Sequence, residues 1–213
     1  TPLLFLLSCS ESVTKEEQSN AQQNVEIQLI DEHWVKLCKA AEEGDKSWME
    51  IDRTGLNEAG IKTFDYTITG KTKSDLERDL GDCEWIHVNG GNAFYLLLQM
   101  RKSGFDQFIK RQINKGVIYS GSSAGSIVAA PDIEITKCIE SKDFEKELGS
   151  FEGLGLVDFI TLPHWGGDDF RELYLNQKIK SAYRKGNKII LLNDDQYVEV
   201  VDGNYKIVDV TKD

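Results

Sequence analysis

Cysteine and proline are scarce in this sequence, and their scarcity excludes several classes of protein. The 213 residues include three prolines and four cysteines, and the cysteines are Cys9, Cys38, Cys83 and Cys138. No two of them have C-x-x-C spacing, so neither a zinc site nor a thioredoxin-like motif is expected. Scattered single cysteines in a chain of this length are typical of a reduced, cytoplasmic protein, and we expect that location.

Positive charge is also in short supply. The chain has 25 Lys and Arg against 36 Asp and Glu, which gives a formal net charge of −11. A nucleic-acid-binding protein normally carries a basic face, because neutralising phosphates drives its affinity. The near neighbours Lys110, Arg111 and Lys115 lie along an expected helix, where we interpret them as a solvated face. Nucleic acid is therefore not an expected partner.

Long hydrophobic runs are missing as well. No stretch approaches the ~20 apolar residues of a membrane-spanning helix, so no membrane partner is expected. The N-terminal run Leu3–Leu7 leads into Ser8-Cys9, and Leu-Leu-Ser-Cys resembles a lipobox. The run is short, and no basic residue precedes it as in a secretory signal. We favour the interpretation of Leu3–Leu7 as a buried first strand.

Short apolar runs alternate with longer amphipathic ones along the rest of the chain. The expected strands are Leu3–Leu7, Trp34–Cys38, Ile61–Ile68, Trp85–Val88, Val117–Tyr119, Phe159–Leu162 and Lys188–Leu192, followed by a terminal hairpin of Tyr197–Val201 and Tyr205–Val210. The expected helices are Asp45–Ala59, Ser74–Leu80 (capped by Ser74 or Asp75), one ending near Lys102, Phe105–Lys115, one beginning near Ala124, and Asp168–Lys185. This alternation predicts one α/β domain over residues 1–213, with a mostly parallel sheet and helices on both faces.

A glycine–serine motif follows the strand Val117–Tyr119. Gly121-Ser-Ser-Ala-Gly125 matches G-x-S-x-G, with a strand before it and a helix after it as this motif requires. A serine on such a sharp turn points its hydroxyl outward, and the amide of the next residue, Ala124, points at the same reacting centre. The alternatives are a tight helix–sheet packing loop and a phosphate-binding turn. We predict that Ser123 is a nucleophile.

A serine nucleophile needs a base to accept its proton. Of the three histidines, His33 precedes a weak strand, and His87 lies inside a strand, where a core or sheet histidine is the simpler interpretation. His164 follows Pro163 at a strand end, which is where a base would face Ser123. The alternative for His164 is a capping or packing role. We favour His164 as the base.

An imidazole base needs an acid behind it, which fixes its tautomer and stabilises its cation. Asp194 and Asp195 follow the strand Lys188–Leu192, and the alternative is that both are ordinary turn aspartates. The chain order Ser…His…Asp differs from the Ser…Asp…His order of α/β-hydrolases. This order indicates a different fold that carries the same chemistry.

A second glycine-rich loop lies one strand–helix unit before the serine. Asn89-Gly-Gly-Asn92 connects the strand Trp85–Val88 to a helix, and paired glycines allow backbone amides to approach a substrate closely. A developing oxyanion needs such donors. We therefore expect one donor from this loop and one from Ala124.

Three segments in this order resemble the peptidase E and cyanophycinase family. They are Asn89-Gly-Gly-Asn-Ala-Phe-Tyr-Leu-Leu97, Ser122-Ser-Ala-Gly-Ser126, and Gly153-Leu-Gly-Leu-Val-Asp-Phe159 with Pro163-His164. The resemblance implies a class I glutamine amidotransferase-like fold, in which serine replaces the amidotransferase cysteine. It also implies hydrolysis of peptide bonds without a metal or a cofactor.

The resemblance assigns roles to individual residues. Ser123 and His164 correspond to the family's nucleophile and base, Asp194 aligns with its third member, and Gly91 and Ala124 correspond to its oxyanion donors. Gly90, Asn92 and Arg171 are expected to contact the substrate, with Arg171 facing an acidic side chain.

Three functions remain open at this point. The first is a peptidase for short peptides, such as dipeptides with N-terminal Asp, and it carries the further expectation of a homodimer. The second is a hydrolase of cyanophycin-like β-aspartyl peptides or other amides. The third is a binding module that uses the same pocket without turnover.

Overall fold

A computed structural model describes residues 3–5, 48–58, 60–137 and 142–211. The strands are β1 (Leu3–Phe5), β2 (Trp85–Val88), β3 (Ile118–Ser122), β4 (Ile160–Leu162), β5 (Ile189–Leu191), β6 (Gln196–Val201) and β7 (Asn204–Asp209). The α-helices are α2 (Trp48–Glu58), α3 (Lys73–Leu80), α4 (Ala93–Ser103), α5 (Phe105–Ile113), α6 (Ala124–Val128), α7 (Lys142–Leu148), α8 (Arg171–Leu173) and α9 (Ile179–Lys185). No helix of these ranges is long and apolar enough to cross a bilayer.

The chain divides into two compact units. One consists of Thr1–Cys9 and Thr67–Val208, and the other of Ser10–Tyr66 and Asp209–Asp213. Strands β1 to β6 and all the expected site residues belong to the first unit. The expected single domain over residues 1–213 stays a prediction.

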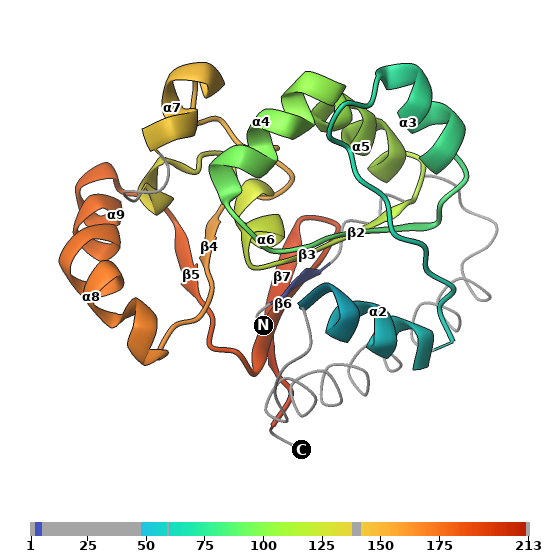
Figure 1. The fold of residues 1–213 in the computed structure, drawn as a ribbon. Helices are drawn as coiled ribbons and strands as arrows, with labels where there is room; N and C mark the ends of the chain where they lie inside the picture. Colours follow the sequence, from blue (N-terminus) through green and yellow to red (C-terminus); the bar gives the residue numbers. More distant parts are fainter. Residues whose placement is uncertain (1–2, 6–47, 59, 138–141, 212–213) are drawn as a thin grey trace. The chain divides into compact units, whose positions relative to one another are not determined.

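The strands form two small sheets (Figure 1). The larger has the order β2-β3-β1-β6-β7, and β4 pairs with β5 in the smaller. β2 is parallel to β3 and β1 is parallel to β6, but β1 is antiparallel to β3. The pair β4–β5 is parallel. The architecture is therefore mixed α/β, and the larger sheet has mixed strand directions where we expected a mostly parallel one.

The terminal hairpin is confirmed. β6 and β7 are neighbours in the sheet and are joined by Asp202-Gly203. Both turn residues have positive φ, 49° at Asp202 and 75° at Gly203. A two-residue turn with positive φ at both positions matches the twist of the strands it joins, which is why Asp-Gly favours this hairpin.

Helix α6 lies between the two sheets in the first unit (Figure 1). It contacts β1, β2 and β3 on one side and β4 on the other. Beyond it, β4 and the helical segment that follows enclose a cluster of buried side chains: Ala130, Ile135, Ile160, Leu162, Tyr174 and Ala182. The helix that begins directly after the predicted nucleophile is thus packed against the strand that leads to the predicted base.

Some expected elements differ from the structure. Residues Ile61–Ile68, expected as a strand, form no ladder here, and Phe64 is largely exposed. The expected helix Asp168–Lys185 is broken into a 3-10 turn (Asp168–Phe170), α8, a π-helical turn (Tyr174–Lys178) and α9. Two further elements were not expected, α7 and the 3-10 helix Glu134–Thr136.

Other expectations lie outside the described residues. These are the strand Trp34–Cys38, the end of the first strand at Leu6–Leu7, His33, and three of the cysteines. Cys83 is the fourth, and it is a free thiol whose pKa is raised by partial burial and by the charge of Asp82.

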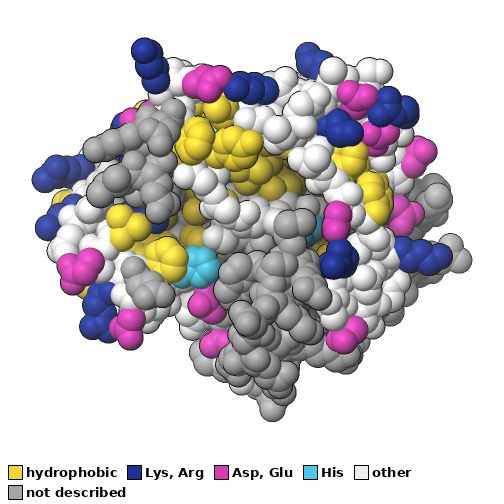
Figure 2. Space-filling view, in the orientation of Figure 1, with side chains coloured by type: hydrophobic (Ala, Val, Ile, Leu, Met, Phe, Trp, Pro, Cys, Tyr) yellow, Lys and Arg dark blue, Asp and Glu magenta, His cyan; other side chains and the backbone are white. Residues whose placement is uncertain are grey.

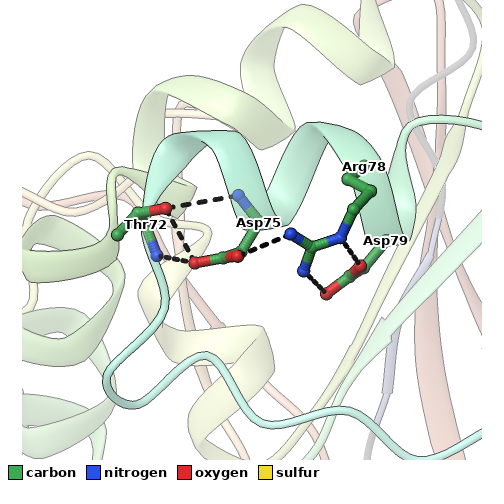
Figure 3. Close-up of polar contacts among 4 residues, drawn as sticks. All are labelled: Thr72, Asp75, Arg78 and Asp79. Carbon is green, nitrogen blue, oxygen red and sulfur yellow. Dashed lines mark hydrogen bonds and ion pairs between the residues drawn. The ribbon is translucent and has the colours of Figure 1, made fainter.

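Helix α3 begins with a capping box (Figure 3). Its cap is Thr72, where we expected Ser74 or Asp75. The Thr72 side chain accepts from the Asp75 amide at 3.3 Å, and the Asp75 carboxylate accepts from the Thr72 amide at 2.9 Å. Arg78 pairs with Asp75 at 2.9 Å and with Asp79 at 2.7 Å. This reciprocal arrangement satisfies two donors that the first helical turn leaves open.

The capping box makes stability depend on pH. Hydrogen bonds from the side chain and backbone of Thr72, aided by Arg78, lower the pKa of Asp75 from 3.8 to about 2. A carboxyl group whose pKa is lower in the folded state stabilises the fold above its unfolded pKa, and this contribution disappears as the pH falls through the folded value. We therefore expect Asp75→Asn to lower the melting temperature at pH 7, with the difference from the wild type shrinking as the pH falls below 3.8 and vanishing below about pH 2. A difference that stays constant from pH 7 to pH 2 would contradict the assignment.

Candidate active site

Ser123 lies on the turn between β3 and α6 in a strained backbone conformation. Its φ is 47° and its ψ is −109°, a combination that residues other than glycine rarely adopt. Strain of this kind persists only where the surrounding structure holds it, and it concentrates at functional sites. The turn is therefore the type of strand-to-helix elbow that G-x-S-x-G predicts.

The glycines of the motif allow the elbow to pack closely. A Cβ atom on Gly125 would lie 2.0 Å from the carbonyl oxygen of Val88, at the end of β2. A Cβ atom on Gly121 would lie 2.4 Å from the carbonyl carbon of Gly125. The Tyr119 hydroxyl donates to the Gly125 carbonyl at 2.6 Å, and complete burial raises the pKa of this phenol. No larger residue fits at either glycine without moving backbone.

The structure brings Ser123, His164 and Asp194 together. His164 Nε2 lies 3.1 Å from Ser123 Oγ, and His164 Nδ1 lies 2.8 Å from Asp194 Oδ1. His164 follows the end of β4 and Asp194 follows the end of β5, so the parallel pairing of these strands places base and acid side by side. Figure 2 shows a surface histidine with hydrophobic and acidic side chains next to it.

The electrostatics of the pair favour an ionised acid. The hydrogen bond from His164 lowers the pKa of Asp194, and partial burial opposes this only in part. The Asp194 side chain is 58% exposed and that of His164 is 19% exposed. A charged carboxylate at Nδ1 fixes the proton on that nitrogen and leaves Nε2 free to accept one.

Two buried hydroxyls join the elbow to β4. Ser126 Oγ donates to the Ser123 carbonyl at 2.7 Å, and Thr161 Oγ1 donates to Ser126 Oγ at 3.2 Å. Ser126 is 0% and Thr161 1% exposed. The amides of Ser126 and Ile127 also donate to the Ser123 carbonyl. The strained residue is thereby tied to the strand that precedes His164.

We expect Ser126→Ala to lower the free energy of unfolding by about 1–3 kcal/mol, because the buried Thr161 hydroxyl then loses its acceptor. Chemical denaturation of the variant and the wild type measures this difference. The double variant Ser126→Ala, Thr161→Val removes donor and acceptor together, so it should be no less stable than Ser126→Ala alone. A single variant as stable as the wild type would show that the two hydroxyls do not act as a pair.

The segment before β4 docks on the end of α6. The Leu154 amide donates to the Val128 carbonyl at 2.7 Å, and the Leu156 amide donates to the Ala129 carbonyl at 2.8 Å. A Cβ atom on Gly153 would lie 2.1 Å from the carbonyl oxygen of Ala130, which explains the glycine at that position.

Arg101, on α4, holds the start of the same segment. Its guanidinium donates to three backbone carbonyls, those of Leu148, Ser150 and Glu152, at 2.6–3.0 Å. Together with the docking on the end of α6, these bonds tie the chain around Gly153 to α4 and α6.

The expected oxyanion loop lies against the nucleophile. A Cβ atom on Gly90 would lie 3.1 Å from the Ser123 Cβ, so the two backbones are close. Gly91 has a φ of 135°, which requires glycine. Asn92 caps α4, and its Oδ1 accepts from the amides of Phe94 and Tyr95 at 3.0 and 3.1 Å. Asn92 thus has a structural role, and its expected contact with substrate stays a prediction.

Ala124 is the first residue of α6 and is buried. Its amide is one of those that the first turn of a helix leaves without an intrahelical acceptor. This leaves the amide available to a ligand at Ser123. The roles of Ala124 and Gly91 as oxyanion donors stay predictions.

Arg171 is placed differently from the other candidates. Its side chain is 65% exposed and pairs with Asp168 at 3.1 Å, three residues earlier on the same segment. To face an acidic substrate it would have to exchange that partner. Its neighbour Phe170 contacts the site directly, and this contact was not foreseen from the sequence because nothing in the sequence pattern pairs Phe170 with His164.

His87 is held in the sheet, as expected for a sheet histidine. Its Nδ1 lies 2.8 Å from Ser120 Oγ, to which the Trp85 indole also donates at 2.7 Å. Trp85 and His87 are on β2, and Ser120 is on the neighbouring β3. These two contacts of Ser120 Oγ are distinct from the contact between His164 and Ser123.

Comparison with known proteins identifies the family. The model of peptidase family S51 matches residues 4–208, which is nearly the whole chain. The chain belongs to peptidase family S51. The match runs from within β1 to within β7, so every segment of the candidate site lies inside it.

Several proteins are similar to this S51 chain. An uncharacterized peptidase of Pasteurella multocida is 30% identical over 169 residues, 76% of this chain and 80% of the relative. An uncharacterized peptidase of Listeria innocua is 28% identical over 155 residues, 73% of each chain. A protein named peptidase E from Shewanella amazonensis is 25% identical over 197 residues, 78% of this chain and 82% of its own.

A solved structure supports the fold. A Listeria monocytogenes protein assigned to peptidase E is similar with a TM-score of 0.64 and 24% identity, covering 78% of this chain and 80% of its own. The family model and the relatives confirm the resemblance to the peptidase E family, and the chain is a peptidase of this family.

Proposed function

We propose that this S51 peptidase is a serine-type hydrolase that cleaves short peptides through an acyl-enzyme. The observation that carries the proposal is the position of His164, whose ring nitrogens lie 3.1 Å from Ser123 Oγ and 2.8 Å from Asp194 Oδ1. Both distances are within the reach expected between a nucleophile, a base and an orienting acid. The strained elbow that presents Ser123 supports the same assignment.

The chemistry follows from these contacts. Ser123 Oγ attacks the scissile carbonyl carbon while its proton moves to His164 Nε2, and Asp194 stabilises the imidazolium that forms. The carbonyl oxygen gains negative charge, which the amides of Ala124 and Gly91 are proposed to stabilise. The C–N bond then breaks as His164 protonates the leaving amine. Water, deprotonated by His164, attacks the acyl-enzyme, and the acid product leaves with Ser123 restored.

The substrate part of the proposal is a short peptide, in particular a dipeptide with N-terminal Asp. Gly90 and Asn92 would line the bound peptide, and Arg171 would leave Asp168 to face the acidic side chain. The proposal further includes a class I glutamine amidotransferase-like arrangement, a single domain, a homodimer and a cytoplasmic location. The proposed reaction requires no metal or cofactor, and neither nucleic acid nor a membrane is proposed as a partner.

Release of p-nitroaniline from a panel of aminoacyl p-nitroanilides tests the proposal. We expect the Asp derivative to be turned over selectively and Ser123→Ala to abolish the reaction. Equal turnover of all derivatives would contradict the Asp preference but would still support a hydrolase. Tight binding of short peptides without turnover would instead favour a binding module on the same fold.

A further inference from the structure

One face of the His164 ring is covered by an aromatic side chain. The rings of His164 and Phe170 are stacked, with centroids 4.9 Å apart and planes inclined by only 14°. A separation and inclination of this kind are typical of offset-stacked aromatic pairs. Phe170 is partly buried, and it packs against the cluster behind β4.

The two hydrogen bonds of His164 act in the plane of its ring. Both lie at the edge of the imidazole, one at Nδ1 and the other at Nε2. Rotation of the ring about the Cβ–Cγ bond of His164 tilts both nitrogens out of that plane, so that the Nε2 lone pair no longer points at Ser123 Oγ. Hydrogen bonds weaken steeply as their angle departs from linear. A flat ring against the imidazole face opposes this tilt.

Phe170 is itself held by its neighbours. It contacts Tyr174, with ring centroids 6.3 Å apart, and Tyr174 contacts Trp165 at 5.7 Å. The buried Tyr174 hydroxyl donates to the carbonyl of Pro163, the residue before His164. Tyr174 also begins the π-helical turn, and turns of this type are frequent at functional sites. The hydrogen bond from Tyr174 to Pro163 therefore closes the segment between them into a loop that contains Phe170.

His164 needs this support because of its backbone. Its φ is 63°, which is unusual for a residue other than glycine. A left-handed residue in a loop keeps its conformation only where contacts hold it. The Tyr174 hydroxyl holds the preceding carbonyl, and the Trp165 amide donates to the Leu192 carbonyl at 2.8 Å on the other side.

We infer that Phe170 is a positioning residue for catalysis, whose ring holds the imidazole of His164 in the plane that contains Ser123 Oγ and Asp194. The inference rests on the proposed function, because it assumes that His164 is the base. Phe170 does not need to touch substrate in this role. Its removal should therefore slow proton transfer and leave substrate affinity largely unchanged.

The test is phosphonylation of Ser123 by a fluorophosphonate probe, which needs an activated serine but no particular peptide. Phe170→Leu keeps an apolar side chain but removes the flat ring, and it should lower the maximal rate of inactivation roughly tenfold, since small misplacements of a reacting group are costly. The half-saturating probe concentration should change by less than about twofold. Phe170→Tyr restores the ring and should restore the rate.

A matched control separates positioning from general loss of packing. Phe159 is buried at 3% exposure and precedes β4, and its ring packs against Tyr205. Phe159→Leu makes the same chemical change without touching His164, and it should label at the wild-type rate. Melting temperatures of all variants show that each is folded at the assay temperature, and Phe170→Met replaces Phe170→Leu where the latter is not.

Two results would overturn the inference while the wild type labels normally. One is a Phe170→Leu variant whose maximal rate of inactivation equals that of the wild type. If only its half-saturating probe concentration changes, Phe170 is part of a binding surface instead. The other is a Phe170→Tyr variant as slow as Phe170→Leu. A wild-type protein that does not label at all would instead refute the proposed nucleophile, and with it the premise of the inference.

Discussion

Replacing Ser123 with alanine should reduce kcat roughly a million-fold, the size of effect that loss of a serine nucleophile has in serine proteases whose triad acts as a unit. The reason is structural as well as chemical. Without Oγ, the imidazole of His164 has no hydroxyl to deprotonate, and no acyl-enzyme forms. The variant should fold, because the Ser123 carbonyl keeps its bonds from Ser126 and Ile127.

The neighbouring serine provides the control for this experiment. Ser122 is the last residue of β3 and is buried, and the contact observed for His164 Nε2 is with the hydroxyl of Ser123. Ser122→Ala should keep most of the wild-type turnover of the peptide panel. The opposite ranking, with Ser122→Ala inactive and Ser123→Ala active, would move the nucleophile by one residue and refute the elbow assignment.

Replacing Asp194 with asparagine should lower kcat by about four orders of magnitude, as loss of the charged acid does in other triads. An amide in place of the carboxylate can donate to Nδ1 and thereby favours the wrong tautomer, in which Nε2 carries the proton. Ser123 then has no acceptor for its own proton. The 2.8 Å contact between His164 Nδ1 and Asp194 Oδ1 is the observation that selects Asp194.

Asp195 is the natural comparison because the sequence alone left both aspartates open. Its amide donates to Asn193 Oδ1 at 3.0 Å, which is a turn contact. Asp195→Asn should therefore retain activity within a few-fold of the wild type, because this turn contact uses the backbone amide of Asp195, which the substitution keeps. Steady-state kinetics of both variants decide the matter, and a greater loss in Asp195→Asn would contradict the assignment of Asp194.

The parts of the site that were predictable from the sequence are the local ones. Trp85–Val88 was expected as a strand and is observed with the same bounds, and the G-x-S-x-G turn lies between a strand and a helix as expected. Each of these depends on neighbouring residues, whose types and spacing the sequence displays directly. Gly121 belongs to the same group, because its small size is required by Gly125, four residues later, whereas Gly125 must be small because of Val88 on β2.

What was not predictable depends on contacts distant in the chain. Ile61–Ile68 has the alternation of a strand, but a strand also needs a partner, which alternation cannot supply. The helix expected over Asp168–Lys185 keeps its apolar spacing although a π-helical turn interrupts it. The stacking of Phe170 on His164 and the bond between Thr161 and Ser126 join segments whose pairing no local pattern encodes.

The three proposed catalytic side chains come from different sheets, and this gives the protein a built-in reporter of its own tertiary structure. Ser123 follows a strand of the larger sheet, whereas His164 and Asp194 follow the two strands of the smaller one. An intermediate in which the smaller sheet had separated from α6 would keep much of its secondary structure, yet its serine would lack a base. Loss of probe labelling should therefore precede loss of the helical circular dichroism signal in any stepwise unfolding. During refolding, the time at which labelling returns would report when the smaller sheet docks on α6.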